Sequence, residues 1–400
     1  MQGGKTMRNI LIYRDSFLPY SETFILAQGE SLETYSPYYV GTSCAGALES
    51  EVPNRKAIIL DRLVSQPGFW KTLYKLSGFV LPRWKKQIYQ TQPLLIHAHG
   101  GKDGDFALPL SRLLNIPLIV TFHGHDATIE KQPADFKPLV PHMMDFISHR
   151  GSFYVDRYLE RRTRLFHVPD KFIAVSDFIR KTVIDKGCPS ERILTHYIGI
   201  DTERFTPVQG VDREPIVLFV GRLVEKKGVE YLIRAMSDVQ KLIPEAQLVL
   251  IGDGAKSSPL KKMADRLNIN AKFLGRQTPE NVIRWMNKSA VFCGPSVVAK
   301  SGDAEGLGMV FLEAQALELP VVSFKSGGIP EAVADEETGI LLPEGDTQAL
   351  GKAITVLLQN PELRARFGKA GRHRVLKKFD LKKQTAKLEN IYDKLISKGD

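Results

Sequence analysis

Residues 216–233 read I-V-L-F-V-G-R-L-V-E-K-K-G-V-E-Y-L-I. An apolar run ends at Val220, a short basic loop bounded by Gly221 and Gly228 follows, and a helical pattern begins near Gly228. A strand, a tight loop and a helix in this order form half of a βαβ unit, which builds parallel sheets covered by helices. This stretch therefore predicts an α/β fold.

Short apolar runs alternate with helical patterns along most of the chain. The expected strands are residues 10–13, 94–97, 118–122, 172–175, 216–220, 248–251, 272–274, 291–293 and 321–324. The expected helices are residues 22–31, 105–114, 154–166, 177–186, 228–242, 260–267, 280–287 and 309–318, and residues 347–396 look helical throughout. The series restarts after the turn-rich stretch 205–214, and a single core stops growing near ~250–300 residues. We expect two α/β domains, residues 1–205 and 206–380.

The composition of the 400 residues is globular, with 43% hydrophobic and 25% charged residues. The three cysteines are scattered, which indicates a reducing compartment and no disulfide framework. No apolar run approaches the ~18–20 residues that span a bilayer, so we expect a cytoplasmic protein. The net charge of +10 fits nucleic acid, anionic lipid or phosphorylated small molecules. Because no nucleic-acid module is recognisable, we expect no nucleic-acid partner.

The basic loop at residues 221–228 is the first candidate for chemistry. Gly221 lets the backbone turn sharply, and Arg222 and Lys227 stand just beyond the carboxyl end of a strand. Ligands of parallel sheets bind at that end, and both cations bind phosphate well. The alternative is an ordinary solvated loop.

The second candidate is E-G-L-G-M-V-F-L-E at residues 305–313. A helix that begins near Met309 would point free N–H groups at the loop, which makes a site for a diphosphate. Glu305 and Glu313 would stand roughly 12 Å apart along a helix, a spacing that suits carboxylates accepting from hydroxyls on either side of a diphosphate. The alternative is a chance pair of glutamates. The free N–H groups at the start of this expected helix would be those of Gly306, Leu307, Gly308 and Met309.

The third candidate is T-F-H-G-H-D at residues 121–126, which ends another expected strand. His123 and Asp126 would stand at its carboxyl end. Two histidines and an aspartate can also indicate a metal, but no fourth ligand is obvious nearby. Asp103 and Asp105 fit a loop and a helix N-cap better than a metal site. We therefore expect no metal. Residues 252–254, G-D-G, lack the third glycine of a dinucleotide fingerprint.

The combination of motifs resembles the family 4 glycosyltransferases, which have the GT-B fold. The N-terminal half matches more loosely, through His123 and residues 199–201. Within the family the sequence is most similar to bacterial enzymes that build exopolysaccharide or lipopolysaccharide, which also carry elements like S-E-T-F at residues 21–24 and H-G-H-D at 123–126. The specific matches are residues 221–222, 227–228, 252–254, 294–296, 305–313 and 327–331.

The resemblance implies two Rossmann-like domains that face each other across a cleft, with residues 381–400 forming a helix that packs back on the N-terminal domain. It implies a retaining hexosyltransferase that needs no metal or other cofactor. Arg222 and Lys227 would neutralise the leaving diphosphate, Glu305 would hold the donor sugar, Glu313 the ribose, and His123 would contact the sugar near its anomeric centre. The departing phosphate would accept the acceptor's proton.

Further residues follow from the shared elements. Many members carry paired glycines after the first strand, whereas residues 16–23 have none, so the role of this loop stays open. The implied donor contacts also include Gly221, Gly306, Leu307, Gly308 and Met309. Candidates on the acceptor side are Ser21, Glu22, Thr23, His125 and Asp126.

Residues 69–89, F-W-K-T-L-Y-K-L-S-G-F-V-L-P-R-W-K-K-Q-I-Y, mix aromatics with Lys and Arg and contain no acid. Residues 157–164 are rich in arginine. Basic amphipathic segments with Trp lie well in an anionic bilayer interface. We expect peripheral docking on the inner face of the membrane and a glycan or polyprenyl-linked acceptor. The alternative is a solvated helix face with core aromatics, and Pro82 interrupts any single helix.

The sequence leaves two alternatives to a glycosyltransferase, a nucleotide-sugar epimerase of the same fold and a basic nucleic-acid-binding protein, and no recognisable nucleic-acid module supports the second. A nucleotide-sugar epimerase can share the two-domain architecture and needs no acceptor, although the paired Glu305 and Glu313 with Arg222 and Lys227 favour transfer. The sequence also leaves the donor open between UDP- and GDP-linked sugars, because a few side chains and backbone positions set the base and the sugar.

Overall fold

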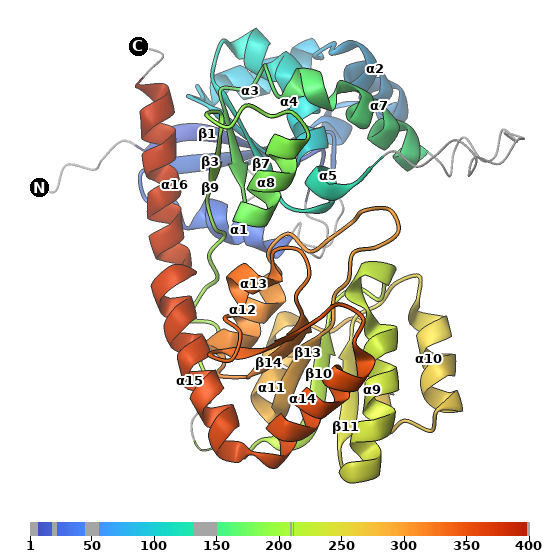
Figure 1. The fold of residues 1–400 in the computed structure, drawn as a ribbon. Coiled ribbons are helices and arrows are strands. Elements are labelled where there is room, and N and C mark those ends of the chain that lie inside the picture. Colours follow the sequence, from blue (N-terminus) through green and yellow to red (C-terminus); the bar gives the residue numbers. More distant parts are fainter. Residues whose placement is uncertain are drawn as a thin grey trace, which may run out of the picture. The chain divides into compact units, whose positions relative to one another are not determined.

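The computed structural model of this protein describes residues 7–17, 22–44, 56–130, 150–208, 210 and 212–397. The chain forms two compact units, Met1–Gly199 with Leu381–Asp400 (unit 1) and Ile200–Asp380 (unit 2). The sequence placed this boundary after residue 205, in the loop that leads into the first strand of unit 2. Each unit has a parallel sheet with helices packed on it (Figure 1).

Unit 1 contains a seven-stranded sheet in the order β5-β3-β1-β6-β7-β8-β9, in which every pair is parallel. A separate pair of short strands, β2 and β4, lies outside it. The strands are β1 Arg8–Tyr13, β2 Ser16–Phe17, β3 Tyr35–Gly41, β4 Ser43–Cys44, β5 Ala57–Ile59, β6 Ile96–His99, β7 Leu118–Phe122, β8 Lys171–Ala174 and β9 Ile193–Thr195. The helices are α1 Thr23–Glu30, α2 Pro67–Ser77, α3 Pro82–Gln90, α4 Gly101–Leu114, α5 His125–Thr128, α7 Arg150–Leu165, α8 Asp177–Asp185 and α16 Leu381–Ile396.

The last helix, α16, belongs to unit 1 although it follows all of unit 2 in the sequence. The Glu389 carboxylate accepts from the backbone N–H groups of Glu33 and Thr34 at 2.9 and 2.7 Å. The buried Tyr392 hydroxyl lies 2.7 Å from the Nδ1 atom of His97. Figure 1 shows α16, in red, alongside β1 and β3. The helix therefore crosses back to the N-terminal domain, as the resemblance implied.

Unit 2 contains a six-stranded parallel sheet in the order β12-β11-β10-β13-β14-β15. Counted within the unit, this is the order 3-2-1-4-5-6 of nucleotide-binding sheets. The strands are β10 Glu214–Val220, β11 Gln247–Ile251, β12 Ala271–Phe273, β13 Ser289–Gly294, β14 Val321–Phe324 and β15 Gly339–Leu342. The helices are α9 Val229–Leu242, α10 Ser257–Arg266, α11 Pro279–Lys288, α12 Met309–Ala316, α13 Ile329–Ala332, α14 Thr347–Gln359 and α15 Pro361–Lys378.

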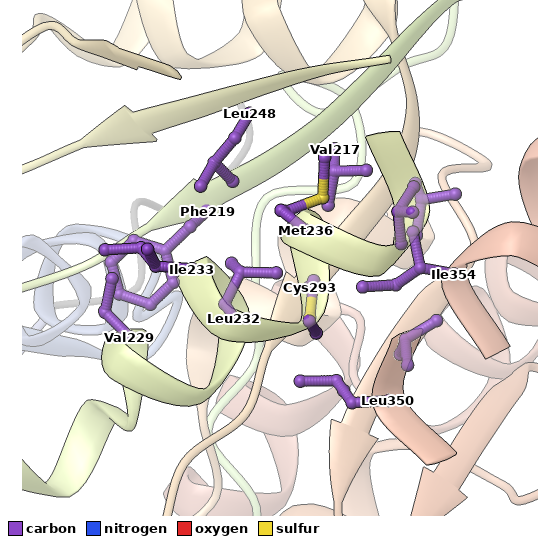
Figure 2. Close-up of a cluster of buried hydrophobic side chains, with 14 of the residues drawn as sticks. Val217, Phe219, Val229, Leu232, Ile233, Met236, Leu248, Cys293, Leu350 and Ile354 are labelled. Carbon is purple, nitrogen blue, oxygen red and sulfur yellow. The ribbon is translucent and has the colours of Figure 1, made fainter. Parts of the chain in front are cut away.

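The core of unit 2 lies where α9 and α14 pack together on the sheet (Figure 2). Helix α9 presents Val229, Leu232, Met236 and Val239 at the spacing of one helical face. Each of these four residues is at most 2% exposed. This packing fixes the position of β10 and of the loop that joins it to α9. Other members of the cluster are Val217, Phe219, Leu248, Cys293, Leu350 and Ile354.

The predicted fold class is confirmed, and the strands expected at 118–122 and 321–324 have the predicted bounds. The strand expected at 94–97 lies instead at Ile96–His99, which buries both His97 and His99. The prediction that Asp103 and Asp105 form a loop and an N-cap was wrong. Both lie inside α4, because Gly100, with φ of 110°, turns the chain directly from β6 into the helix.

The loops after β10 and β13 touch at the point where the strand order of unit 2 reverses. Gly228 has φ of 60°, and a Cβ atom there would lie 1.9 Å from the carbonyl oxygen of Pro295. The Val297 N–H donates to the Lys226 carbonyl at 2.8 Å. Only a glycine allows this approach of two backbones, so the loops hold each other in place.

Replacing Gly228 with alanine should destabilise unit 2 far more than the same replacement at Gly275. The φ angles are 60° and 63°, so both variants share the cost of a left-handed alanine, about 1–2 kcal/mol. A Cβ atom at Gly275 meets nothing within 4 Å, whereas one at Gly228 meets a backbone oxygen. Thermal unfolding measures the difference. Equal melting temperatures for the two variants would contradict the close approach.

Candidate active site

The predicted site residues of unit 2 gather at the carboxyl ends of β10 and β13. These strands are neighbours, but the chain leaves them toward opposite sides of the sheet, and ligands of such sheets bind at this switch point. The loop after β10 supplies Gly221, Arg222 and Lys227, and the segment after β13 supplies Glu305 and Gly308.

Lys227 and Glu305 form an ion pair at this switch point. The Lys227 Nζ atom lies 2.5 Å from the Glu305 Oε2 atom, and the two side chains are only 14% and 13% exposed. Burial would raise the pKa of Glu305, but the ammonium groups of Lys227 and Lys226 outweigh it and hold this pKa below its usual value. Glu305 is therefore a carboxylate at neutral pH.

A second ion pair lies beside the first and was missed in the sequence. The Lys226 Nζ atom lies 2.9 Å from the Asp303 Oδ1 atom and 3.4 Å from the Ala304 carbonyl oxygen. Its side chain is 8% exposed. The signal that could have identified Lys226 is the K-K pair before Gly228, one lysine for each neighbouring carboxylate. Lys226 ties the loop after β10 to the segment that carries Glu305.

Helix α12 begins beside the Glu305 carboxylate. Its N-cap is Gly308, with φ of 83°, and a Cβ atom there would lie 3.4 Å from the Glu305 Cγ atom. No side chain caps this helix, and its first turn contains no acidic residue. The positive end of the helix dipole thus lies next to the Lys227 ammonium, which suits an anion. Gly306 and Leu307 are buried in the turn before it, and Met309 is its first residue.

Glu313 lies on α12 and is partly buried. Burial raises the pKa of Glu313 to about 7, against the opposing positive charge of Arg204. The two glutamates that the sequence picked out therefore differ, since Glu305 is held as a carboxylate and Glu313 is partly protonated at neutral pH.

Arg222 is exposed, and its guanidinium has no hydrogen bond or ion pair with any residue that the structure describes. Gly221 packs against the turn after β11, where a Cβ atom at Gly252 would lie 1.9 Å from the Gly221 carbonyl oxygen. Gly254 approaches the Leu223 carbonyl similarly. The G-D-G segment thus serves to pack this loop closely.

In unit 1, His123 lies just after β7 and beside His99 of β6. The His123 Nε2 atom is 3.1 Å from the His99 Nδ1 atom, and the rings stack. Burial lowers the pKa of both rings, so one nitrogen of the pair donates and the other accepts. The His123 ring also lies 5.2 Å from the Phe24 ring. The structure thereby brings the S-E-T-F and H-G-H-D elements together.

Arg14 and Asp103 complete this cluster and were missed in the sequence. Arg14 donates to both carboxylate oxygens of Glu22, at 2.7 and 2.6 Å, and to Asp103. Arg14 follows β1, and Asp103 lies in the first turn of α4, which follows β6. The strand order of unit 1 reverses between β1 and β6, so residues that directly follow these two strands lie close together. A charged residue after each strand was therefore the sequence signal that could have identified Arg14 and Asp103.

The remaining candidates of unit 1 differ in their surroundings. Asp126 accepts from the backbone N–H groups of Gly101, His123 and Gly124 at 2.8, 3.1 and 3.0 Å, so it shapes the turn after β7. Thr23 and His125 are exposed at the first positions of α1 and α5. Ser21 lies outside the described residues.

Within the described ranges, no group of three or more His, Cys, Asp or Glu residues is placed to hold a metal ion. In the same part of the chain no helix combines the length and the apolar character needed to cross a membrane. Among the described residues of the unit 2 site, Arg222, Lys226 and Lys227 carry positive charge, and the α12 dipole adds to it. A site of this kind can bind a phosphorylated ligand and present a carboxylate to its hydroxyl groups.

Two family models cover most of the chain. The model described as Glycosyl transferases group 1 matches residues 201–374, and the model described as Glycosyltransferase Family 4 matches residues 36–204. The first spans most of unit 2, including the whole Lys227–Glu305 site, and the second spans most of unit 1.

Curated relatives agree with these models. Alpha-maltose-1-phosphate synthase of Mycolicibacterium smegmatis is 30% identical over 332 residues, covering 75% of this chain and 79% of the relative. The amylovoran biosynthesis glycosyltransferase AmsK of Erwinia amylovora is 29% identical over 325 residues, covering 78% and 74%. A GDP-mannose-dependent monoacylated alpha-(1-6)-phosphatidylinositol monomannoside mannosyltransferase of Corynebacterium glutamicum is 35% identical over 206 residues, covering 48% and 54%. The chain covers only 54 to 63% of the length of three curated relatives, and this mannosyltransferase is one of the three.

Among solved structures, HepE from Anabaena in complex with UDP and glucose is similar over 97% of this chain and 100% of HepE, with a TM-score of 0.75 and 19% identity. That likeness shows the fold, which is GT-B. Since family models match both units and a relative at 30% identity aligns over three quarters of the chain, the protein belongs to the family 4 glycosyltransferases.

Proposed function

We propose that the protein transfers a hexose, with retention of anomeric configuration and without a metal ion, from a UDP- or GDP-linked donor to a glycan or lipid-linked acceptor in bacterial surface polysaccharide biosynthesis. The observation that carries the proposal is the buried Lys227–Glu305 pair at the uncapped N-terminus of α12. A diphosphate fits the cations and the helix end, and a sugar fits the carboxylate. The names of AmsK and of the mannosyltransferase support the class of reaction.

In the proposed reaction the bond between the anomeric carbon and the phosphate oxygen breaks, and a bond from the acceptor oxygen to that carbon forms. The departing phosphate develops negative charge as its bond to the anomeric carbon breaks, and it then takes the proton that the acceptor hydroxyl releases. Lys227, Arg222 and the N–H groups at the start of α12 stabilise that charge, which is the task a metal ion performs elsewhere. Further donor contacts come from the backbone at Gly221, Leu307 and Gly308.

The two glutamates hold the hydroxyl groups on either side of the diphosphate. Glu305, kept ionised by its lysine neighbours, accepts from hydroxyls of the donor sugar. Glu313 accepts from the ribose. His123, with a buried Nδ1 atom that has no partner among the described residues, supplies the polar contact near the anomeric centre that the family resemblance implies.

A donor panel tests the proposal. Nucleoside diphosphates should raise the melting temperature of the protein by mass action, and nucleotide sugars incubated with lipid-linked or glycan acceptors should yield a retained linkage in the presence of a chelator. Lys227→Ala and Arg222→Ala should weaken diphosphate binding by about tenfold, the loss of one charge-assisted contact. Calorimetry with UDP and GDP measures it.

Lys241→Ala is the matched control, because this lysine is exposed on α9 and, among the described residues, pairs only with Asp238 across a helical turn. Glu305→Ala should abolish transfer while nucleotide binding persists. Full transfer by Glu305→Ala would remove the central assignment. Formation of an epimer from donor alone, with no acceptor, would favour a nucleotide-sugar epimerase instead.

Glu313→Gln should stabilise the empty protein and weaken its nucleotide binding. In the unfolded chain this carboxyl ionises at its ordinary pKa, and in the folded protein it ionises only at about 7. Between these values the unfolded state loses its proton first, so native stability falls as the pH rises. The variant should therefore melt above the unmodified protein at pH 8, and this advantage should shrink toward pH 5. A difference that is the same at both pH values would contradict the burial of this charge.

We further propose that unit 1 docks on an anionic membrane to reach a lipid-linked acceptor. Phe69 and Phe79 are 58% and 46% exposed, and Trp70 links them with ring centroids at 5.2 and 6.4 Å. Pro82 begins α3, so the expected basic segment forms two helices, α2 and α3. Arg157 of α7 donates to the Leu76 carbonyl at the end of α2, which places the arginine-rich helix beside the aromatic cluster. Exposed apolar side chains flanked by cations fit an anionic interface.

The double variant Phe69→Ser/Phe79→Ser should lose flotation with vesicles that contain phosphatidylglycerol, because most of the exposed aromatic surface of the cluster is gone. Leu242→Ser, which removes an equally exposed apolar side chain from unit 2, should float as the unmodified protein does. Flotation of the double variant at the unmodified level, or no flotation of the unmodified protein, would contradict the docking surface. Flotation with vesicles of phosphatidylcholine alone, which carry no net charge, shows how much of the binding depends on anionic lipid.

A further inference from the structure

The two side chains that are assigned to different parts of the donor form an ion pair with each other. Lys227 is assigned to the diphosphate and Glu305 to the sugar, yet the Nζ and Oε2 atoms lie 2.5 Å apart. No other partner of either terminal group occurs among the described residues. Each group therefore makes its one described polar contact with the other, and a ligand that binds either group competes with that contact.

Backbone contacts hold both segments that carry this pair, so rotation of the side chains is the simplest way to open it. The Gly328 N–H donates to the Glu305 carbonyl at 2.8 Å, and a Cβ atom at Gly327 would lie 2.3 Å from the same oxygen. The Lys227 N–H donates to the Val224 carbonyl at 3.1 Å. Rotation of the two side chains thus suffices to open the pair.

Lys226 shows by contrast which lysine can exchange partners. Its ammonium has two acceptors, Asp303 and the Ala304 carbonyl, and it is nearly buried. Within the part of the chain that the structure describes, Lys227 has the single acceptor Glu305, and its side chain is 14% exposed against 8% for Lys226. Lys226 remains in place as a structural cation, and Lys227 is the group able to leave.

We propose that donor binding exchanges the partners of this ion pair, an inference that rests on the proposed function. Lys227 leaves Glu305 and binds the diphosphate, and the freed carboxylate accepts from hydroxyls of the sugar. A buried carboxylate that loses its cation and gains no donor is costly. A nucleoside diphosphate alone leaves Glu305 in that state, whereas a nucleotide sugar supplies the missing donors. Recognition of the diphosphate and recognition of the sugar are therefore coupled through one ion pair.

The exchange predicts opposite effects of one substitution on two ligands. Glu305→Gln releases Lys227 before any ligand binds, so UDP or GDP should bind about three- to tenfold more tightly than to the unmodified protein, a range typical of an ion pair of moderate strength. The same variant should bind the matching nucleotide sugar more weakly, because an amide accepts less strongly from hydroxyls than a carboxylate does.

A double-mutant cycle distinguishes the exchange from simple repulsion between Glu305 and the phosphates. Calorimetry with UDP and with GDP is carried out on the unmodified chain, Glu305→Gln, Lys227→Met and the double variant. The exchange predicts that the gain from Glu305→Gln disappears in the Lys227→Met background. A gain that persists there means through-space repulsion and overturns the exchange.

The remaining outcomes separate the two proposals. If the unmodified protein binds a nucleoside diphosphate but Glu305→Gln binds it no more tightly, the exchange is wrong and the proposed function stands. If the unmodified protein binds neither UDP nor GDP, the proposed function fails and the exchange fails with it. A single cooperative transition in the thermal unfolding of each variant shows that the compared proteins are folded; Lys227→Met should melt at a lower temperature, because it leaves the Glu305 carboxylate without its cation.

Discussion

The site of this protein depends on one backbone contact, the passage of Gly228 against the Pro295 carbonyl. The strand order of unit 2 puts β10 beside β13, but adjacency alone leaves their loops free to diverge. With no side chain at Gly228 the loops touch, and the Val297–Lys226 hydrogen bond fastens them. Lys227 on one loop thereby meets Glu305 on the segment after the other, although the two residues lie far apart in the sequence.

This arrangement pairs the opposite charges of the site. Two lysines face two carboxylates, Lys226 with Asp303 and Lys227 with Glu305, and the N-terminus of α12, which has no side-chain cap and no acidic residue in its first turn, adds positive potential. The site thus has cations that can bind an incoming diphosphate. Until a diphosphate binds, the carboxylates pair with the two lysines, so that neither lysine is an unpaired buried ion. The same cations lower the pKa of Glu305 and keep it ionised for contact with hydroxyls, whereas burial raises the pKa of Glu313 to about 7.

The sequence predicted the fold class because apolar strands such as 118–122 and 321–324 stand out from the helical patterns around them. It missed β3, which contains Pro37 and is rich in tyrosine, and the short strand β9. Glu305, Lys227 and Gly308 were predictable because motif residues at strand ends meet in a parallel sheet. Lys226, Asp303, Arg14 and Asp103 were not singled out, because their importance arises from partners distant in sequence, which spacing does not reveal.

A structure of the protein with a bound nucleoside diphosphate tests the central claim most directly. The account predicts the phosphate oxygens within hydrogen-bond distance of the Lys227 ammonium and of the backbone N–H groups at the start of α12, with the Lys227 Nζ atom no longer at 2.5 Å from Glu305. Phosphates bound away from residues 305–309, or an intact Lys227–Glu305 pair beside the bound nucleotide, would contradict it.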